Sequence, residues 1–195
     1  WYMDEEDENH NPTGKRITTN DYGSADYYYV NKSSLPKVYG GFNTSLSWKG
    51  FDLSAIFAYS IGGYIYNRDV TMILHNGSLE GRDWSTEILR RWTPDNRYTD
   101  VPALSTTSNN WNSASTRFLQ NNSYMRLKNL TLSYNLPKQW ISKLSLSSVQ
   151  VYVQGDNLFT IHRNQGLDPE QGITGITYYR YPAMRTISGG INVSF

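Results

Sequence analysis

The sequence predicts an all-β fold, in which about five antiparallel strands form part of a transmembrane barrel with long extracellular loops. Segments of about ten residues alternate between apolar and small polar side chains, a pattern typical of a sheet between two unlike solvents. Short and long joins between these segments also alternate, as they do in outer-membrane barrels. The final residue, Phe195, is an aromatic residue on the apolar side of the last segment, whereas soluble chains usually end in a polar, frayed tail.

Residues 1–37 precede the first expected strand, and the order of the joins places them outside the cell as a loop segment. Within them, Asp7, Asn9 and Asn11 have the first three ligand spacings of a calcium loop. Pro12 occupies the position where such a loop needs Gly, and no Glu follows at the twelfth position. We therefore expect a solvated acidic loop and keep calcium as the alternative.

The barrel segment is expected over residues 38–195, and it begins with a hairpin of strands near 38–48 and 51–60. Apolar residues occupy alternate positions in both strands, and Lys49-Gly50 forms a tight turn between them. A long extracellular loop near 61–122 follows. In that loop a capping Asp or Ser and the stop at Pro94 predict a short helix near Asp83–Trp92.

The third strand is expected near 123–135. Leu130 and Leu132 alternate correctly, but Leu127 falls on the opposite phase, which predicts either a bulge near Asn129 or an apolar pair turned inward. A compact connection with one helical turn is expected after Pro137.

A fourth strand near 148–159 carries valine at alternate positions. A second extracellular loop near 160–184 leads to the last strand, near 185–195, where the apolar residues again alternate with small polar ones. Short joins lie on the periplasmic side of such barrels and long joins lie outside the cell. The last strand starts from a long loop, so the C-terminus is expected in the periplasm. Five strands are too few for a closed bacterial barrel, so we expect further strands upstream.

The composition excludes several classes of protein. A net charge of +1 gives no sign of a nucleic-acid partner, and the absence of cysteine excludes disulfide scaffolds and thiolate metal sites. Mean hydropathy is -0.60, which is compatible with barrel strands because every second residue in them is polar. Sixteen Tyr and six Trp fit interfacial aromatic belts or a carbohydrate-stacking surface.

Several motifs resemble the C-terminal third of the SusC/RagA family, the TonB-dependent outer-membrane transporters that import glycans or peptides. The motifs are SYMRLKNLTLSYNLP (123–137), GFDLSAIFAYSIGGYIYN (50–67), RRWTPDNRYTDVPAL (90–104), VYVQGDNLFT (151–160), GLDPE (166–170) and GGINVSF (189–195). Their order along residues 37–195 is more specific than any one of them.

This resemblance implies a 22-stranded barrel in the outer membrane of a Gram-negative bacterium, and nutrient uptake as the function. It also implies an N-terminal plug, a TonB-contacting segment and a SusD-like lipoprotein lid. Neither the plug nor the TonB-contacting sequence is present in these residues, so transport is expected of a longer parent protein. The terminal strand resembles the signal that the barrel-assembly machinery reads, with Ile191, Val193 and Phe195 as its apolar residues.

No catalytic residue, metal site or cofactor is expected. Asp168 and Glu170 are two residues apart in a turn segment without a supporting His or Arg. The three histidines are far apart in the sequence, and the serines lack a nucleophile elbow. An enzyme is therefore not predicted.

Aromatic residues in the outer loops are the candidate contacts with substrate or with a lid. They are Trp84, Trp92, Trp111, Tyr178 and Tyr179. Each has an alternative role in bracing its loop. Two alternatives to the transporter remain open: a surface carbohydrate-binding β-domain, which should stay in buffer without detergent, and a passive outer-membrane porin, which should have no plug upstream.

Overall fold

The computed structural model describes residues 1–77, 79, 81–105, 110–164, 166–170 and 174–195. These residues form two compact units. The first unit comprises residues 1–32 and 66–119, and the second comprises residues 33–65 and 120–195.

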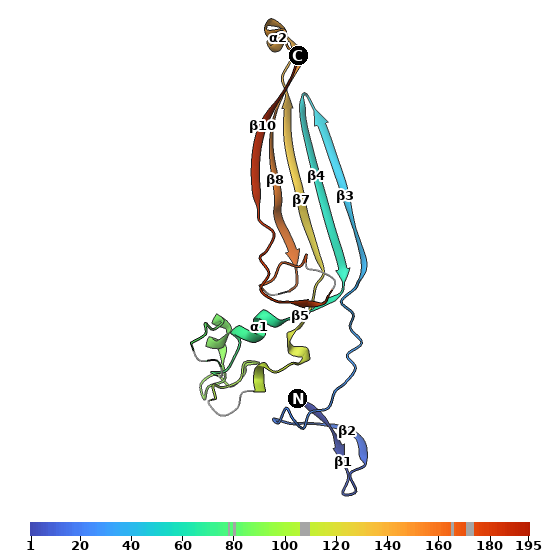
Figure 1. Cartoon of the computed structure of the whole chain (residues 1–195), viewed down its shortest axis with the longest axis vertical. Helices are drawn as coiled ribbons and strands as arrows, with labels where there is room; N and C mark the ends of the chain where they lie inside the picture. The colour runs from blue at the N-terminus through green and yellow to red at the C-terminus, as the bar shows by residue number, and fades with distance from the viewer. Residues whose placement is uncertain (78, 80, 106–109, 165, 171–173) are drawn as a thin grey trace. The chain divides into compact units, whose positions relative to one another are not determined.

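A five-stranded antiparallel sheet dominates the second unit (Figure 1). Its strands lie in the order β10-β8-β7-β4-β3. The bounds are Pro36–Trp48 for β3, Phe51–Gly62 for β4, Tyr124–Asn135 for β7, Ser148–His162 for β8 and Thr186–Ser194 for β10. Each strand pairs antiparallel with the next one of this sheet along the chain, which is the topology of an up-and-down barrel wall. The predicted fold class, part of an all-β barrel, is confirmed.

One face of the sheet is apolar, because the register aligns apolar residues of neighbouring strands. Leu53 on β4 pairs with Leu132 on β7, and Leu132 pairs with Val153 on β8. The apolar side chains of the last strand are exposed, 73% for Ile187 and 65% for Ile191. A continuous apolar surface of this kind is the lipid-facing side of a barrel wall.

Aromatic residues gather toward both ends of this apolar face. Near the β3–β4 turn, Trp48 pairs with Phe51 and Phe51 with Tyr134, and the Phe51 and Tyr134 ring centroids are 4.5 Å apart. Toward the opposite end, Tyr59 pairs with Gly40 and Met125, and Phe159 pairs with Leu127. Aromatic belts of this kind lie at the two membrane–water interfaces.

The opposite face carries a hydrogen-bonded polar network. Asn135 Nδ2 donates to the Asp52 carboxylate at 2.6 Å, and Gln150 Nε2 donates to Asn135 Oδ1 at 3.1 Å. Asn192 Nδ2 extends this network by donating to Gln150 Oε1 at 3.1 Å. These bonds cross from β4 to β10 and satisfy polar groups without using the apolar face.

A β-bulge at Lys128 keeps the apolar residues of β7 on one face. Leu127 pairs with Phe57 and Leu130 pairs with Ala55, and the register shifts between these pairs. Phe57 and Ala55 are two residues apart, so their side chains lie on the same face of β4. Leu127 and Leu130 therefore share that face, and the bulge is the correct one of the two predicted alternatives.

Short connections lie at one end of the sheet. Lys49 and Gly50 have positive φ angles of 48° and 88°, as a two-residue type I′ turn requires. Helix α2 (Lys138–Ile141) and the 3-10 helix η4 (Ser142–Leu144) join β7 to β8. The C-terminus lies at this same end (Figure 1), and the long segments leave from the other end.

A second, small sheet was not predicted. It has the order β6-β5-β9, with bounds Leu119–Asn121, Tyr64–Asn67 and Ile176–Thr177. Strands of two to four residues are too short to produce a recognisable alternation. The two regions expected only as loops thus contribute strands.

The first unit contains a hairpin where only a loop segment was expected. Strand β1 (Tyr2–Glu6) pairs antiparallel with β2 (Pro12–Thr18). Because β2 is exposed along its whole length, it has no buried face, and no apolar alternation marks it in the sequence.

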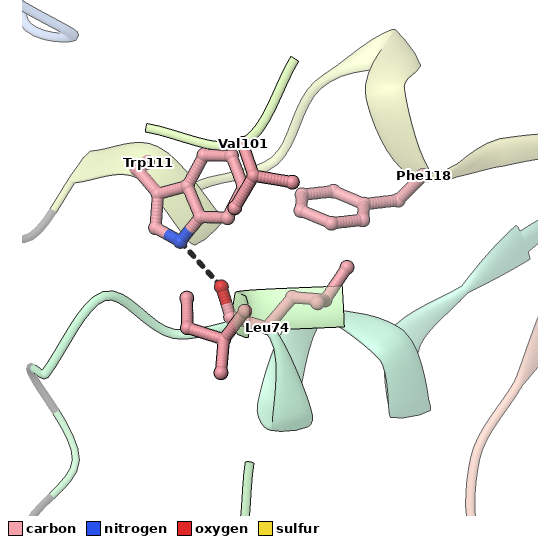
Figure 2. Close-up of a cluster of buried hydrophobic side chains, with 5 residues drawn as sticks. Leu74, Val101, Trp111 and Phe118 are labelled. Atoms are coloured by element: carbon pink, nitrogen blue, oxygen red, sulfur yellow. Dashed lines mark hydrogen bonds between the residues drawn. The ribbon is translucent and has the colours of Figure 1, made fainter. Parts of the chain in front are cut away.

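A small hydrophobic cluster forms the core of the first unit (Figure 2). Its buried members are Leu74, Ile88, Val101, Trp111 and Phe118. Trp111 Nε1 donates a hydrogen bond to the Leu74 carbonyl, as Figure 2 shows. The indole N–H is therefore satisfied although its ring is buried.

Four short helices surround this core. They are α1 (Arg68–Ile73) and the 3-10 helices η1 (Thr86–Arg90), η2 (Asn110–Asn112) and η3 (Thr116–Phe118). The helix expected over 83–92 is present as η1, where the Ser85 side chain caps the helix by accepting from Glu87 N at 3.3 Å. None of the described helices is long and apolar enough to span a membrane.

Candidate functional site

A buried ion pair fastens the 163–185 loop to the sheet at the end opposite the short connections. Arg126 on β7 donates from Nη2 to Asp168 Oδ1 at 2.5 Å, and the two side chains are 4% and 5% exposed. Arg126 Nε also donates to Thr160 Oγ1 on β8 at 2.8 Å. Arg126 pairs with Ala58 and Thr160 in the register, which places it on the polar face of the sheet.

A second carboxylate completes this arrangement. Glu170 accepts from Arg126 Nη1 at 2.7 Å and from Lys128 Nζ at 2.8 Å. Lys128 is the bulge residue of β7, so the bulge contributes a cation to the same site. We call Arg126, Lys128, Asp168 and Glu170 the rim cluster. Its two cations and two carboxylates neutralise one another.

Asp168 also organises the backbone of the loop. Its Oδ1 accepts from Glu170 N at 2.9 Å, and its Oδ2 accepts from Ala183 N at 2.6 Å. Burial by itself raises the pKa of Asp168, but the hydrogen bonds from Ala183, Glu170 and Arg126 together hold that pKa below its ordinary value of 3.8. The carboxylate is therefore charged at neutral pH and ties both ends of the loop to β7.

Sequence reasoning found Asp168 and Glu170 in a turn but missed their cationic partners. The separation between Arg126 and Asp168 is 42 residues, and no local pattern links them. One signal was present in the sequence: Arg126 and Lys128 flank Leu127 at the point where the alternation of the strand fails. Bulges often lie at the rims of barrels, where they redirect a side chain.

The three loop tryptophans lie in different environments of the first unit. Trp111 is 9% exposed in the hydrophobic cluster, and the Arg117 guanidinium lies 4.0 Å from its ring centroid. The Trp111 ring is therefore part of the core of the first unit. Trp84 and Trp92 are 41% and 43% exposed, so part of each ring is open to solvent.

Trp84 is held by a buried histidine. Its Nε1 donates to His75 Nδ1 at 3.0 Å, and burial lowers the pKa of His75 below its ordinary value of 6.5. The imidazole is thus neutral and acts as an acceptor at Nδ1. The exposed part of the Trp84 ring has a fixed orientation as a result.

The two tyrosines of the last loop lie against each other. The ring centroids of Tyr178 and Tyr179 are 4.2 Å apart, and Tyr179 has a φ of +48°. Tyr178 is 46% exposed and Tyr179 is 64% exposed. The pair presents aromatic surface from the loop that the rim cluster anchors.

The calcium candidates lie in the β1–β2 turn. The Asp7 carboxylate accepts from the backbone N–H groups of Asn9 and Asn11, both at 2.9 Å, and the bond from Asn11 is the main cause that lowers the pKa of Asp7. This is a turn-stabilising use of the carboxylate. In the described part of the chain, no group of three or more His, Cys, Asp or Glu residues is arranged to hold a metal ion.

The terminal apolar residues face away from any core. Ile191 pairs with Val151 and Val193 with Val149, and Phe195 is 94% exposed. Strand β10 has a paired neighbour on one side within the described residues, which is β8. Its other edge therefore presents ladder donors and acceptors to a further strand.

No family model matches the chain. Individual relatives do match, and they are TonB-dependent receptors. TonB-dependent receptor P3 of Formosa agariphila is 34% identical over 166 residues, which cover 80% of this chain and 16% of that protein. TonB-dependent receptor SusC of Bacteroides thetaiotaomicron is 27% identical over 168 residues, which cover 86% of this chain and 16% of that protein.

The fold is similar to that of solved importers. The RagAB peptide importer in its closed-closed state aligns with a TM-score of 0.81 and 34% identity, over 98% of this chain and 20% of that chain. This chain thus spans about a sixth of the length of the curated relatives. Almost all of this chain therefore has a counterpart within a longer protein.

Proposed function

The chain belongs to the SusC/RagA family of TonB-dependent receptors, which are outer-membrane proteins, and from this premise we propose that it forms part of the wall and outer loops of an importer. The observation that carries the proposal is the two-faced sheet. Its apolar face has aromatic residues toward both ends, and its polar face is hydrogen-bonded from β4 to β10. A wall between lipid and a polar interior needs both faces.

The proposed orientation follows from the two unlike ends of the sheet. In outer-membrane barrels the turns on the periplasmic side are short and the extracellular loops are long. The Lys49-Gly50 turn, helix α2 and the C-terminus therefore lie on the periplasmic side in this proposal. Residues 1–37 and the segments near 61–122 and 160–184 lie outside the cell.

The proposed cargo is a peptide or a glycan. The similarity to a peptide importer makes peptides the first cargo to test. In this proposal the exposed aromatic rings of Trp84, Trp92, Tyr178 and Tyr179 contact cargo or a lid, and Trp111 braces its loop. Flat aromatic faces suit both peptide side chains and sugar rings.

The proposed partners act at different parts of the parent protein. A SusD-like surface lipoprotein closes the extracellular side, and TonB supplies energy through a plug region outside this chain. The barrel-assembly machinery recognises the terminal strand through Ile191, Val193 and Phe195, because an exposed strand edge can add to another sheet. Energy-dependent uptake with a lid distinguishes this importer from a passive porin.

Site-specific labelling tests the orientation. The chain contains no cysteine, so Lys49→Cys at the short turn and Tyr181→Cys in the last loop introduce single thiols into it. In intact cells, a membrane-impermeant maleimide should label Tyr181→Cys and leave Lys49→Cys unlabelled until the outer membrane is opened. The parent receptor without either substitution controls for thiols elsewhere. Labelling of Lys49→Cys in intact cells would show that the short turn lies outside the cell, and would contradict the proposed orientation.

Uptake assays test the function. Cells with and without the parent gene are given fluorescent peptides and oligosaccharides, in the presence and absence of TonB. TonB-dependent uptake of either cargo supports the importer, and uptake that persists without TonB indicates a porin. A parent protein that stays in buffer without detergent would instead be a soluble binding domain.

A further inference from the structure

A hollow of about 570 Å³ lies at the loop end of β8, between the last residues of that strand and the anchored 163–185 loop. The register between β10 and β8 begins at the pair Thr186–Asp156, so β8 continues to His162 without β10 beside it. Pro182, which also lines the hollow, has no backbone N–H and cannot donate to a ladder. The chain before β10 therefore does not pair with the end of β8, and the hollow lies between the two.

The hollow adjoins the polar side of the sheet. Arg126, Thr160 and His162 line it. Arg126 pairs with Thr160 and Tyr124 pairs with His162, so both β8 residues share the polar face with Arg126. Phe159, on the opposite face of β8, also borders the hollow. The hollow thus runs along the edge of β8 that β10 leaves open.

The hollow has an excess of positive charge. Arg180 and Arg185 line it and are exposed, and within the described ranges neither of them forms an ion pair. The acidic side chain that lines the hollow, Asp168, is paired with Arg126. Two guanidinium groups therefore remain for an anionic ligand, and guanidinium groups bind carboxylates with bidentate geometry.

The hollow is larger and more apolar than a small anion requires. Its volume falls within the range of about 300–1,000 Å³ that is typical of sites for small organic ligands. Apolar side chains contribute to its walls, namely Phe159, Leu167, Pro169, Pro182 and Ala183. A free inorganic anion would leave most of this space empty. A peptide can supply a carboxylate and, next to it, an apolar side chain.

We propose that this hollow holds a carboxylate of a peptide cargo, with the guanidinium groups of Arg180 and Arg185 as its partners. The inference rests on the proposed import of peptides, and it adds a preference for peptides that carry a free carboxylate. In the proposed orientation the hollow lies at the extracellular rim of the wall, where cargo enters. Because Asp168 ties the loop that carries both arginines to Arg126, the rim cluster positions this site.

Peptide binding to the purified full-length receptor tests the proposal. Three N-acetylated hexapeptides are compared by isothermal titration calorimetry in detergent. Two share one sequence without charged side chains and end in a free carboxylate or in an amide, and the third ends in an amide but carries one internal Glu. We expect at least one of the two charged peptides to bind about tenfold more tightly than the neutral amide, because a hydrogen bond between charged groups contributes more than one between neutral groups. The two charged peptides distinguish a chain-terminal carboxylate from a side-chain carboxylate.

The two arginines are tested by substitution. The double variant Arg180→Gln/Arg185→Gln should abolish the preference for the charged peptide. Arg163→Gln is the matched control, because it removes an exposed cation of the same loop that does not line the hollow, and it should keep the preference. The heat-modifiable migration of each variant on gels confirms that the barrel is folded.

Four results would overturn the proposal. The first two are equal binding of the three peptides by the unmodified receptor and a preference that survives the double substitution. The third is an equal loss of preference in Arg163→Gln, which would assign the effect to general positive charge. The fourth is binding of inorganic phosphate as tight as that of the preferred peptide, which would indicate a site for a small free anion.

The binding assay uses purified receptor without cells or TonB. An absence of TonB-dependent uptake would therefore count against the proposed import function and leave the measured carboxylate preference intact. Equal binding of the three peptides beside TonB-dependent uptake would overturn this inference alone.

Discussion

Arg126 and Asp168 are 42 residues apart in the chain, yet their side chains meet at 2.5 Å with exposed fractions of only 4% and 5%. The pair joins a strand of the barrel wall to a loop that presents Tyr178 and Tyr179. Buried charges are tolerated when they are paired and hydrogen-bonded. The position of the aromatic loop therefore depends on this contact.

Arg126→Leu should detach the 163–185 loop, because it leaves the Asp168 carboxylate buried without its partner. Breaking such a pair costs about 3–5 kcal/mol. We expect faster hydrogen exchange of backbone amides in the loop, measured by mass spectrometry on the full-length receptor. The strands of the sheet should keep their protection.

The double variant Arg126→Leu/Asp168→Leu separates pairing from packing. It removes both charges, so the loop should recover part of its protection relative to Arg126→Leu. Exchange as fast as in the single variant would mean that the backbone bonds to Asp168, and not the ion pair, hold the loop.

The anchoring of the loop should resist mild acid. The hydrogen bonds to Asp168 lower its pKa in the folded protein below 3.8, the ordinary value that also applies to the unfolded chain. The stability that Asp168 contributes is therefore complete at a pH above 3.8, and it is lost as the pH falls through the lower pKa of the folded protein. Hydrogen exchange in the loop, corrected for the intrinsic rate, should be constant from pH 7 to pH 5 and rise below about pH 4. Asp168→Asn, which cannot ionise, should show no such rise. A transition near pH 6 in the unmodified receptor would assign the titration to another group.

Much of the sheet could be predicted from the sequence because its two faces meet different solvents. Alternation locates each strand to within three residues of its structural bounds, and the failed phase at Leu127 locates the bulge. Each of these signals is local, since the side-chain period of a strand is two residues.

The rim cluster and the first unit could not be predicted in the same way. The contact between Arg126 and Asp168 depends on the path of a long loop, and the β1–β2 hairpin has no buried face to produce a pattern. The buried position of Trp111 depends on Leu74 and Val101, which are distant in the sequence. Composition suggested a bracing or binding role for Trp111 but could not decide between them.

Substitutions on the apolar face should have effects that depend on depth. Val153 and Val149 both belong to the apolar face of β8, but Val149 is the second residue of the strand, at the end of the sheet that carries the short connections. Arginine costs about 2–4 kcal/mol at the bilayer midplane and about 0–1 kcal/mol near an interface. Val153→Arg should therefore lower the free energy of unfolding in lipid vesicles far more than Val149→Arg, as measured by urea titration. Equal losses would contradict the assigned position of the membrane.

The first unit should loosen in mild acid through His75. Burial lowers the pKa of this imidazole below 6.5, so the unfolded form takes up a proton first and the stability of the unit falls as pH drops below 6.5. Protonation also removes the acceptor for Trp84 Nε1. We expect faster hydrogen exchange around residues 74–92 at pH 5.5 than at pH 7.5, after correction for the intrinsic rate. His75→Gln keeps an acceptor but does not titrate, and an unchanged pH dependence in this variant would exclude His75 as the cause.

Phe195→Ala should reduce the amount of assembled receptor without destabilising the barrel once it has formed. The Phe195 ring is 94% exposed and contributes little packing, whereas the free edge of β10 and its apolar residues are available during assembly. Trp140→Ala is the matched control, because Trp140 lies on α2 at the same end of the sheet and is 65% exposed. The folded fraction in isolated outer membranes, measured by heat-modifiable migration, should fall several-fold for Phe195→Ala and stay unchanged for Trp140→Ala. A normal folded fraction for Phe195→Ala would show that assembly does not depend on the terminal ring.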